Sequence, residues 1–229
     1  MTSTHRYGEH PDQLCELNGS AGPAVVLIHG GFWRARYGLD LMRPLADDLA
    51  GRGWATWNVE YRRLGTGGGC PETLEDVAAA CRVAGELRLD PLVALGHSAG
   101  GHLALWLAGE GLVAGAVALA GVCCLADASR EGLGRGAAGE FMRGSTDFAR
   151  ADPVQRLPTG VPTVLVHGRR DRIVPLGQSR RYFAAACAAG DRCELVPFDG
   201  GHFPVIDPAS HIWPTIVNRL EALRRKPAR

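Results

Sequence analysis

The first candidate for chemistry is a serine that stands between glycines at the end of an apolar segment. Residues 96–100 read Gly-His-Ser-Ala-Gly, which matches the pattern G-x-S-x-G. The apolar run 92–95 precedes this motif, and helix-forming residues follow it. This context predicts a sharp strand-to-helix turn that exposes the Ser98 hydroxyl for nucleophilic attack, with Gly96 and Gly100 leaving room for the turn. The alternative is an ordinary tight turn in which Ser98 only caps the helix.

Two further residues have types suited to activating a serine. A serine hydroxyl is a poor nucleophile at neutral pH and needs a base, which in turn is oriented by an acid. His202 lies in a loop shaped by two glycines and a proline, and Asp171 lies just past the apolar run 162–166. Asp199 is a rival acid, but it stands only three residues before His202, whereas acid and base normally come from separate loops. The alternatives are a surface histidine and a solvated turn aspartate paired with an arginine.

A glycine-rich loop after another apolar run predicts donors for a developing negative charge. Residues 29–33 read His-Gly-Gly-Phe-Trp. Acyl chemistry requires N–H groups that face the oxyanion, and glycines let the backbone approach a substrate closely. We expect those donors to be the N–H groups of Gly31 or Phe32, together with that of Ala99. The loop itself would be shaped by His29 and Gly30; the alternative is a plain glycine-rich turn.

The elements that position these residues alternate along the chain. Short apolar runs typical of buried parallel strands occur at 24–28, 54–59, 92–95, 113–120, 162–166 and 193–196. Helical patterns lie between or after them, at 41–49, 71–88, 102–108, 176–189 and 212–223. Such alternation predicts an α/β fold, with a mainly parallel sheet covered by helices on both faces. Function in such sheets lies at the carboxyl ends of the strands. The segment 121–160 has no clear period, and we expect it to be a short excursion within a single domain, 1–229.

Composition and charge exclude several other classes of protein. The 229 residues carry a formal net charge of +1, which argues against an electrostatic nucleic-acid binder. No apolar run is long enough for a membrane span, and residues 1–22 lack the apolar core of a signal peptide. The seven cysteines show no C-x-x-C spacing, and His97 and His102 lack the spacing of a zinc motif. We therefore expect a cytoplasmic protein without metal or cofactor, and leave open a homodimer paired through an edge strand or the last helix.

These motifs together give the chain a resemblance to a known family. From Ala24 onward it resembles an α/β-hydrolase, and the order Ser98, Asp171, His202 is the order of that fold's triad. The pair H-G-G-F-W and G-H-S-A-G-G-H is similar to kynurenine formamidases (arylformamidases) and small carboxylesterases. The resemblance implies an oxyanion hole in the H-G-G-x-W loop, whose tryptophan position is filled by Trp33. Because little chain precedes Ala24, we expect the family's first strands to be missing or reduced and, given the small 121–160 segment, the lid to be slight.

The function predicted from the sequence is that of a serine hydrolase. It would cleave a small-molecule ester or N-formyl amide through an acyl-enzyme, as the resemblance to arylformamidases and carboxylesterases implies. Trp33 and Tyr61 are candidate substrate contacts because they lie next to the oxyanion loop or follow a strand. Two other functions stay open: acyl transfer or lyase chemistry on the same triad, and non-catalytic binding on a hydrolase fold.

Overall fold

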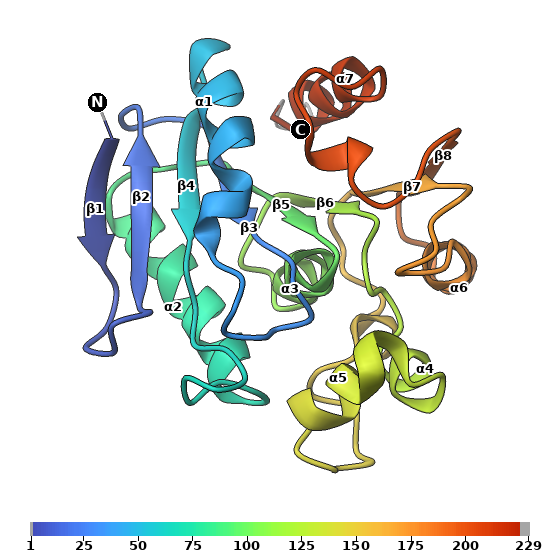
Figure 1. The fold of residues 1–229 in the computed structure, drawn as a ribbon. Coiled ribbons are helices and arrows are strands. Elements are labelled where there is room, and N and C mark those ends of the chain that lie inside the picture. The colour runs from blue at the N-terminus through green and yellow to red at the C-terminus, as the bar shows by residue number, and fades with distance from the viewer. Residues whose placement is uncertain (1, 225–229) are drawn as a thin grey trace.

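One eight-stranded sheet forms the centre of the molecule in the computed structural model, which describes residues 2–224. The strands follow the order β1-β2-β4-β3-β5-β6-β7-β8 (Figure 1). The first two strands are antiparallel to their neighbours, and the other six run parallel. The strands are β1 (Thr2–Arg6), β2 (Leu14–Asn18), β3 (Ala24–Ile28), β4 (Ala55–Val59), β5 (Leu92–His97), β6 (Gly115–Leu119), β7 (Thr163–Gly168) and β8 (Cys193–Phe198).

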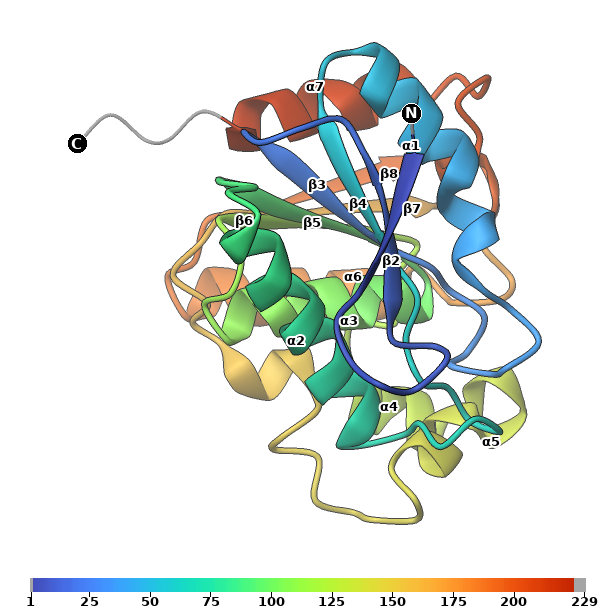
Figure 2. The same ribbon diagram turned by 90° about the vertical axis from the view of Figure 1, so that its left-hand side faces the viewer.

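Helices cover both faces of this sheet, as the predicted alternation requires. Figure 2 shows α1 and α7 on one face and α2, α3 and α6 on the other. The helices are α1 (Arg43–Gly51), α2 (Glu72–Glu86), α3 (Ala99–Gly109), α4 (Leu125–Arg130), α5 (Leu133–Phe141), α6 (Gly177–Ala188) and α7 (Trp213–Arg224). The bounds of α1, α2, α3, α6 and α7 fall within a few residues of the predicted ranges, whereas α4 and α5 lie in the segment for which no helix was predicted. The sequence therefore contained the α/β architecture in the spacing of its apolar residues.

Alternate residues of each central strand point to opposite helical layers. In β3, Val26 and Ile28 belong to the core beneath α2 and α3, whereas Val25 and Leu27 pack with α1 and α7. All five residues of this strand are fully buried, because a parallel sheet covered on both faces leaves no side open to water. The chain therefore has two apolar cores, one on each side of the sheet.

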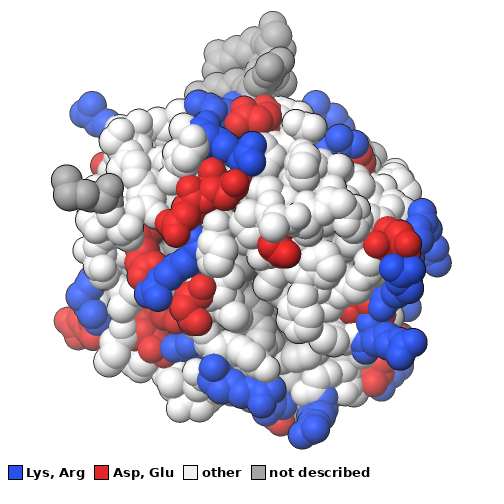
Figure 3. Space-filling view, turned by 45° about the horizontal axis from the view of Figure 1, so that its top comes forward, with Lys and Arg blue, Asp and Glu red and all other residues white. Residues whose placement is uncertain are grey.

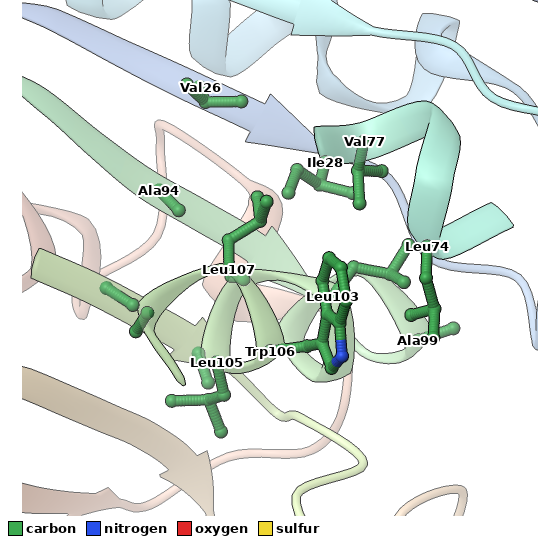
Figure 4. Packing of buried hydrophobic residues seen from close by; sticks show 14 of the residues in the cluster. Val26, Ile28, Leu74, Val77, Ala94, Ala99, Leu103, Leu105, Trp106 and Leu107 are labelled. Atoms are coloured by element: carbon green, nitrogen blue, oxygen red, sulfur yellow. The ribbon is translucent and has the colours of Figure 1, made fainter. Parts of the chain in front are cut away.

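The helix that follows the serine motif, α3, is buried on all sides. Residues 99–108 of α3 are all buried, and Figure 4 shows Leu103 and Leu107 among side chains of β3, β5 and α2. A helix that is apolar all round is stable only when other elements enclose it. The enclosure fixes the position of its first turn, at the carboxyl end of β5.

The N-terminal segment forms two short strands, where we expected the family's first strands to be missing or reduced. The structure contains both first strands, each five residues long, as an antiparallel pair whose second member hydrogen-bonds to β4. Strand β1 is polar and lies at the sheet edge, where every residue but one is exposed. Edge strands carry no buried face and hence no strong alternation of apolar residues, so their sequence gives little signal. Only Cys15 of the pair is fully buried.

The segment 121–160 forms two short helices rather than irregular chain. Figure 1 shows α4 and α5 beyond the end of the sheet toward which β4 points, which is the carboxyl edge of the parallel strands. Three consecutive residues of α5, Gly134, Arg135 and Gly136, have left-handed φ angles of 62°, 59° and 81°. Because of this break in the helix, the apolar residues of the segment follow no regular helical period.

Truncation of a core side chain should measure how much the sheet depends on its second apolar layer. We expect Leu27→Ala in β3 to lower the free energy of unfolding by about 2–5 kcal/mol, because Leu27 is fully buried and a cavity would remain. Urea denaturation of both proteins gives this difference. Ile173→Ala is the control, since Ile173 is 38% exposed, and a loss as large as that of Leu27→Ala would contradict the packing described.

Candidate active site

Ser98 occupies a strained turn between β5 and α3. Its φ and ψ angles are 56° and −115°, a conformation that non-glycine residues rarely adopt. The Ser98 amide donates a hydrogen bond to the Leu119 carbonyl oxygen at 2.9 Å, and the Ser98 carbonyl accepts one from the Val122 amide at 3.1 Å. The neighbouring strand end thus holds the turn in place.

The two glycines of the motif are required by close backbone contacts. A Cβ atom on Gly96 would overlap the carbonyl of Gly100, and a Cβ on Gly100 would overlap the carbonyl oxygen of Ile28 at the end of β3. Neither overlap can be relieved by rotating a side chain, because both involve backbone atoms. The turn can therefore form only with glycine at these positions.

His202 and Asp171 come together from two separate loops. The Nδ1–H of His202 donates to Oδ2 of Asp171 at 2.7 Å, and both side chains are almost fully buried. The other carboxylate oxygen of Asp171 accepts the amides of Ile173 and Val174 at 2.8 and 2.9 Å. Asp199, the rival acid, instead forms an exposed ion pair with Arg170.

A second histidine, His167, contacts the carboxylate of Asp171. His167, which is fully buried at the end of β7, lies with its Nε2 3.4 Å from the carboxylate of Asp171 and 2.8 Å from the carbonyl oxygen of Val174. Its Nδ1 lies 2.7 Å from the hydroxyl of Ser179, so Nε2–H is the donor and Nδ1 accepts the hydroxyl proton. His167 was not among the residues singled out from the sequence. Its place four residues before Asp171 was the available signal.

These contacts set the charge of the acid. Burial raises the pKa of the Asp171 carboxyl, but hydrogen bonds from His167 and His202 outweigh that effect and hold the pKa well below its usual range. The carboxylate therefore stays ionised at neutral pH and faces the imidazole of His202 as a negative charge.

A third histidine, His97, packs against the base. The two ring centroids are 4.6 Å apart, and Nε2–H of His97 donates to the backbone carbonyl oxygen of His202 at 3.2 Å. Burial, together with the nearby His202, lowers the pKa of His97 to about 3. His97 is therefore neutral at physiological pH and adds no positive charge beside His202.

The loop after β3 offers backbone N–H groups next to the serine. Gly31 and Phe32 have φ angles of 105° and 52° and lie with Ser98 around one cavity. Among residues 2–224, the amides of Phe32 and Ala99 have no hydrogen-bond acceptor. Unpaired N–H groups at such a position are suited to an oxyanion.

Buried contacts fix the start of this loop. His29 lies between the carbonyl oxygen of Gly30 and the carboxylate of Glu60, each at 2.8 Å, and stacks on the ring of Tyr61 with centroids 4.3 Å apart. The Tyr61 hydroxyl donates to the His29 carbonyl oxygen at 2.9 Å. Both ring nitrogens of His29 thus have acceptors within the fold, and the residue has no path to a substrate.

The two expected substrate contacts are corrected by the structure. Trp33 is 1% exposed and packs edge-on against His102 and beside Phe141, while Tyr61 is fully buried on His29. The left-handed φ of 56° at Trp33 turns its side chain into the core. Adjacency in sequence to the oxyanion loop did not reveal on which side of the loop each ring would lie.

A small apolar cavity joins the predicted site residues. Its volume is about 170 Å³, and it is lined by Gly31, Phe32, Tyr37, Leu41, His97, Ser98, Ile173, His202, Phe203 and Ile206. Ser98 and His202 thus face the same space, with Asp171 on the far side of His202. The sequence predicted Ser98, His202, Gly31 and Phe32; the apolar wall comes from residues that no motif marked.

The described part of the chain contains no group of three or more His, Cys, Asp or Glu side chains arranged to hold a metal ion. Cys123 and Cys124 are buried near the end of β6, and burial raises the pKa of the Cys124 thiol to about 12. None of the helices within residues 2–224 is long and apolar enough to cross a membrane.

Comparison with known proteins places this geometry in a class. Residues 14–115 match the family model BD-FAE. A search of curated proteins finds no significant match. The chain has an α/β-hydrolase fold, and the three solved structures described next, which share it, are esterases.

Three solved structures illustrate the similarity. The esterase Est2 of the planctomycete Thermogutta terrifontis, with butyrate bound, is 27% identical, covers 96% of this chain and 91% of its own, and has a TM-score of 0.74. The same esterase phosphoramylated by tabun is 25% identical over 96% of this chain and 91% of its own, with a TM-score of 0.76. Esterase B from Lactobacillus rhamnosis shares the fold alone, with 21% identity, 98% and 86% coverage and a TM-score of 0.81.

The low pKa of Asp171 predicts how its contribution to stability depends on pH. A carboxyl whose pKa is depressed in the folded state stabilises the fold above its unfolded pKa of about 3.9, and this contribution is lost as the pH falls toward the folded value. We therefore expect the free energy of unfolding of wild type to be about 1–3 kcal/mol higher than that of Asp171→Asn at pH 6. The difference should shrink between pH 4 and pH 3.

Urea denaturation of both proteins at several pH values tests this expectation. Asp40→Asn is the matched control, because it removes one exposed carboxylate outside the site. A difference between wild type and Asp171→Asn that stays constant from pH 6 to pH 3 would contradict the hydrogen-bonded, ionised state of Asp171.

Proposed function

We propose that the protein is a serine hydrolase that cleaves a carboxylic ester or an N-formyl amide. The observation that carries the proposal is the strained Ser98 turn, which shares one cavity with a histidine hydrogen-bonded to a buried carboxylate. A nucleophile, a base and an orienting acid in this relation are the parts needed for acyl transfer through a covalent intermediate.

The first half-reaction forms the acyl-enzyme. Ser98 Oγ attacks the carbonyl carbon as Nε2 of His202 takes the hydroxyl proton, while Asp171 accepts Nδ1–H and stabilises the imidazolium. The carbonyl oxygen becomes an oxyanion and receives hydrogen bonds from the Ala99 amide and from that of Gly31 or Phe32. The loss of one such donor typically costs about 3–4 kcal/mol of transition-state stabilisation.

The second half-reaction returns the enzyme to its starting state. When the tetrahedral intermediate collapses, the bond to the leaving group breaks and His202 donates its proton to the departing oxygen or nitrogen. Water then attacks the Ser98 ester, with His202 again as the base. The products are a carboxylic acid, or formic acid from a formamide, and the free alcohol or amine.

The size and lining of the cavity support a short acyl group. A volume of about 170 Å³ accommodates a formyl, acetyl or butyryl group but not an extended fatty chain. The rings of Phe32 and Phe203 at the cavity favour an aromatic leaving group, as in an aryl ester or an aryl formamide such as N-formylkynurenine. The butyrate held by the similar Est2 structure agrees with this size.

Covalent labelling tests the assignment of the nucleophile. We expect wild type to react with a fluorophosphonate probe and Ser98→Ala to lose at least about 99% of that labelling, because no other serine lies in the strained turn. A related organophosphorus modification is described for the similar Est2. Ser145→Ala removes an exposed serine outside the cavity and should keep the reaction. Undiminished labelling of Ser98→Ala would sink the assignment.

Steady-state turnover tests the substrate class. We expect kcat/KM for p-nitrophenyl acetate or butyrate to exceed that for the octanoate by at least about tenfold, since each methylene that the cavity cannot hold is penalised. If kcat/KM for N-formylkynurenine is at least as high as that for these esters, the protein is a formamidase. If the esters are cleaved and N-formylkynurenine is not, the protein is a carboxylesterase. Equal rates from acetate to octanoate would contradict the role of the small cavity.

A further inference from the structure

A second, larger cavity adjoins the one that contains Ser98. Its volume is about 620 Å³, and Gly31, Phe32 and Tyr37 line both cavities. The remaining lining residues are Arg34, Arg36, Gly134, Arg135 and Glu140. The loop that carries the expected oxyanion donors thus lies between an apolar space beside Ser98 and a space lined by three arginines and one glutamate.

The charge of this larger cavity is not balanced within the fold. Arg34 is neutralised by Glu140, with nitrogen and oxygen 3.1 Å apart. The guanidinium of Arg36 lies 4.6 Å from the centre of the Tyr37 ring, and neither Arg36 nor Arg135 has a carboxylate partner among residues 2–224. Two exposed positive charges therefore face a cavity whose lining holds no negative charge beyond that of Glu140.

The backbone holds one of these arginines at the cavity. Arg135 has a left-handed φ of 59° between two glycines that are also left-handed, a conformation that costs a non-glycine residue free energy. Gly134 packs so closely on the ring of Phe32 that a Cβ atom there would overlap it. The α5 segment thus packs against the oxyanion loop through Gly134. This contact places the next residue, Arg135, at the edge of the larger cavity.

We propose that the substrate carries a carboxylate, which binds to Arg36 and Arg135 while its ester or formamide carbonyl lies at Ser98; this rests on the proposed hydrolase function. Guanidinium groups match a carboxylate in charge and in planar, two-point geometry. The shared residues Gly31 and Phe32 place the two cavities side by side, so that one small molecule reaches both. The larger volume suits a group the size of an amino acid or a short dicarboxylate.

Matched substrate pairs test the proposal. The acyl pair is mono-4-nitrophenyl glutarate and 4-nitrophenyl pentanoate, and the leaving-group pair is 3-acetoxybenzoate and its methyl ester. In each pair only one member carries a carboxylate. We expect wild type to favour the anionic member of at least one pair, and Arg36→Gln/Arg135→Gln to lower kcat/KM for it by about fivefold or more. The neutral members should change less than twofold, and salt should reduce the wild-type preference.

A matched control separates local from overall charge. Arg82→Gln/Arg180→Gln also removes two exposed arginines that form no ion pair among the described residues, but these arginines lie outside the cavity. This variant should leave the ratio of kcat/KM for the anionic member to kcat/KM for the neutral member unchanged in each pair. Arg36→Lys/Arg135→Lys should recover part of the preference. If wild type cleaves the neutral esters and the Gln variant slows both members of each pair alike, or neither, the carboxylate proposal is overturned while the hydrolase function stands. If wild type cleaves no ester and does not react with the fluorophosphonate, the hydrolase proposal itself has failed.

Discussion

The close approach of α3 to the end of β3 determines how the serine turn and the glycine-rich loop are positioned. Gly100, in the first turn of the helix, lies directly against the carbonyl oxygens of Ile28 and His29. Gly30 in turn lies against the carbonyl oxygen of His97, and a Cβ atom on it would lie 2.9 Å from Cβ of Ser98. Two motifs about seventy residues apart in sequence are therefore pressed together by backbone contact alone, and neither tolerates a larger residue.

This contact explains why so much apolar surface of α3 is buried. The left-handed turn at Ser98 is unfavourable, and it persists only if the helix behind it cannot move. The enclosure of residues 99–108 by the sheet and α2 supplies that rigidity. On this frame the histidine and the acid arrive on loops from β8 and β7, and a buried chain of contacts from Ser179 through His167 to Asp171 fixes the acid. Side chains of both signs are scattered over the surface shown in Figure 3, with uncharged surface between them, in keeping with a net charge of +1.

The architecture could be predicted from the sequence, and so could the side chains that meet at the candidate site, because both depend on local patterns. Fully buried strands read as apolar runs, and the serine turn requires glycines at fixed spacing, so 24–28 and 96–100 were recognisable without a structure. The pairing of Asp171 with His202 followed from the rule that parallel strands end at one edge of the sheet. These inferences needed no knowledge of how distant side chains pack.

What the sequence could not give was the surroundings of the site. Trp33 and Tyr61 lie beside the loop in sequence, yet backbone angles and stacking bury them. Strand β1 escaped prediction because it is a polar, exposed edge strand, and β2 because only Cys15 of its five residues is fully buried. Helix α5 escaped prediction because three left-handed residues interrupt its period. The arginine-lined cavity is formed by residues 34–37 and 134–140, which meet only in three dimensions.

In the proposed mechanism, Ser98 carries the acyl group during turnover. The most direct measurement is peptide mass mapping of the protein quenched in acid during turnover of p-nitrophenyl butyrate. We predict one butyryl group per chain on the peptide that contains Ser98, and none in Ser98→Ala. A butyryl group on another residue, or p-nitrophenol released by wild type with no acyl-enzyme and no dependence on Ser98, would contradict the account.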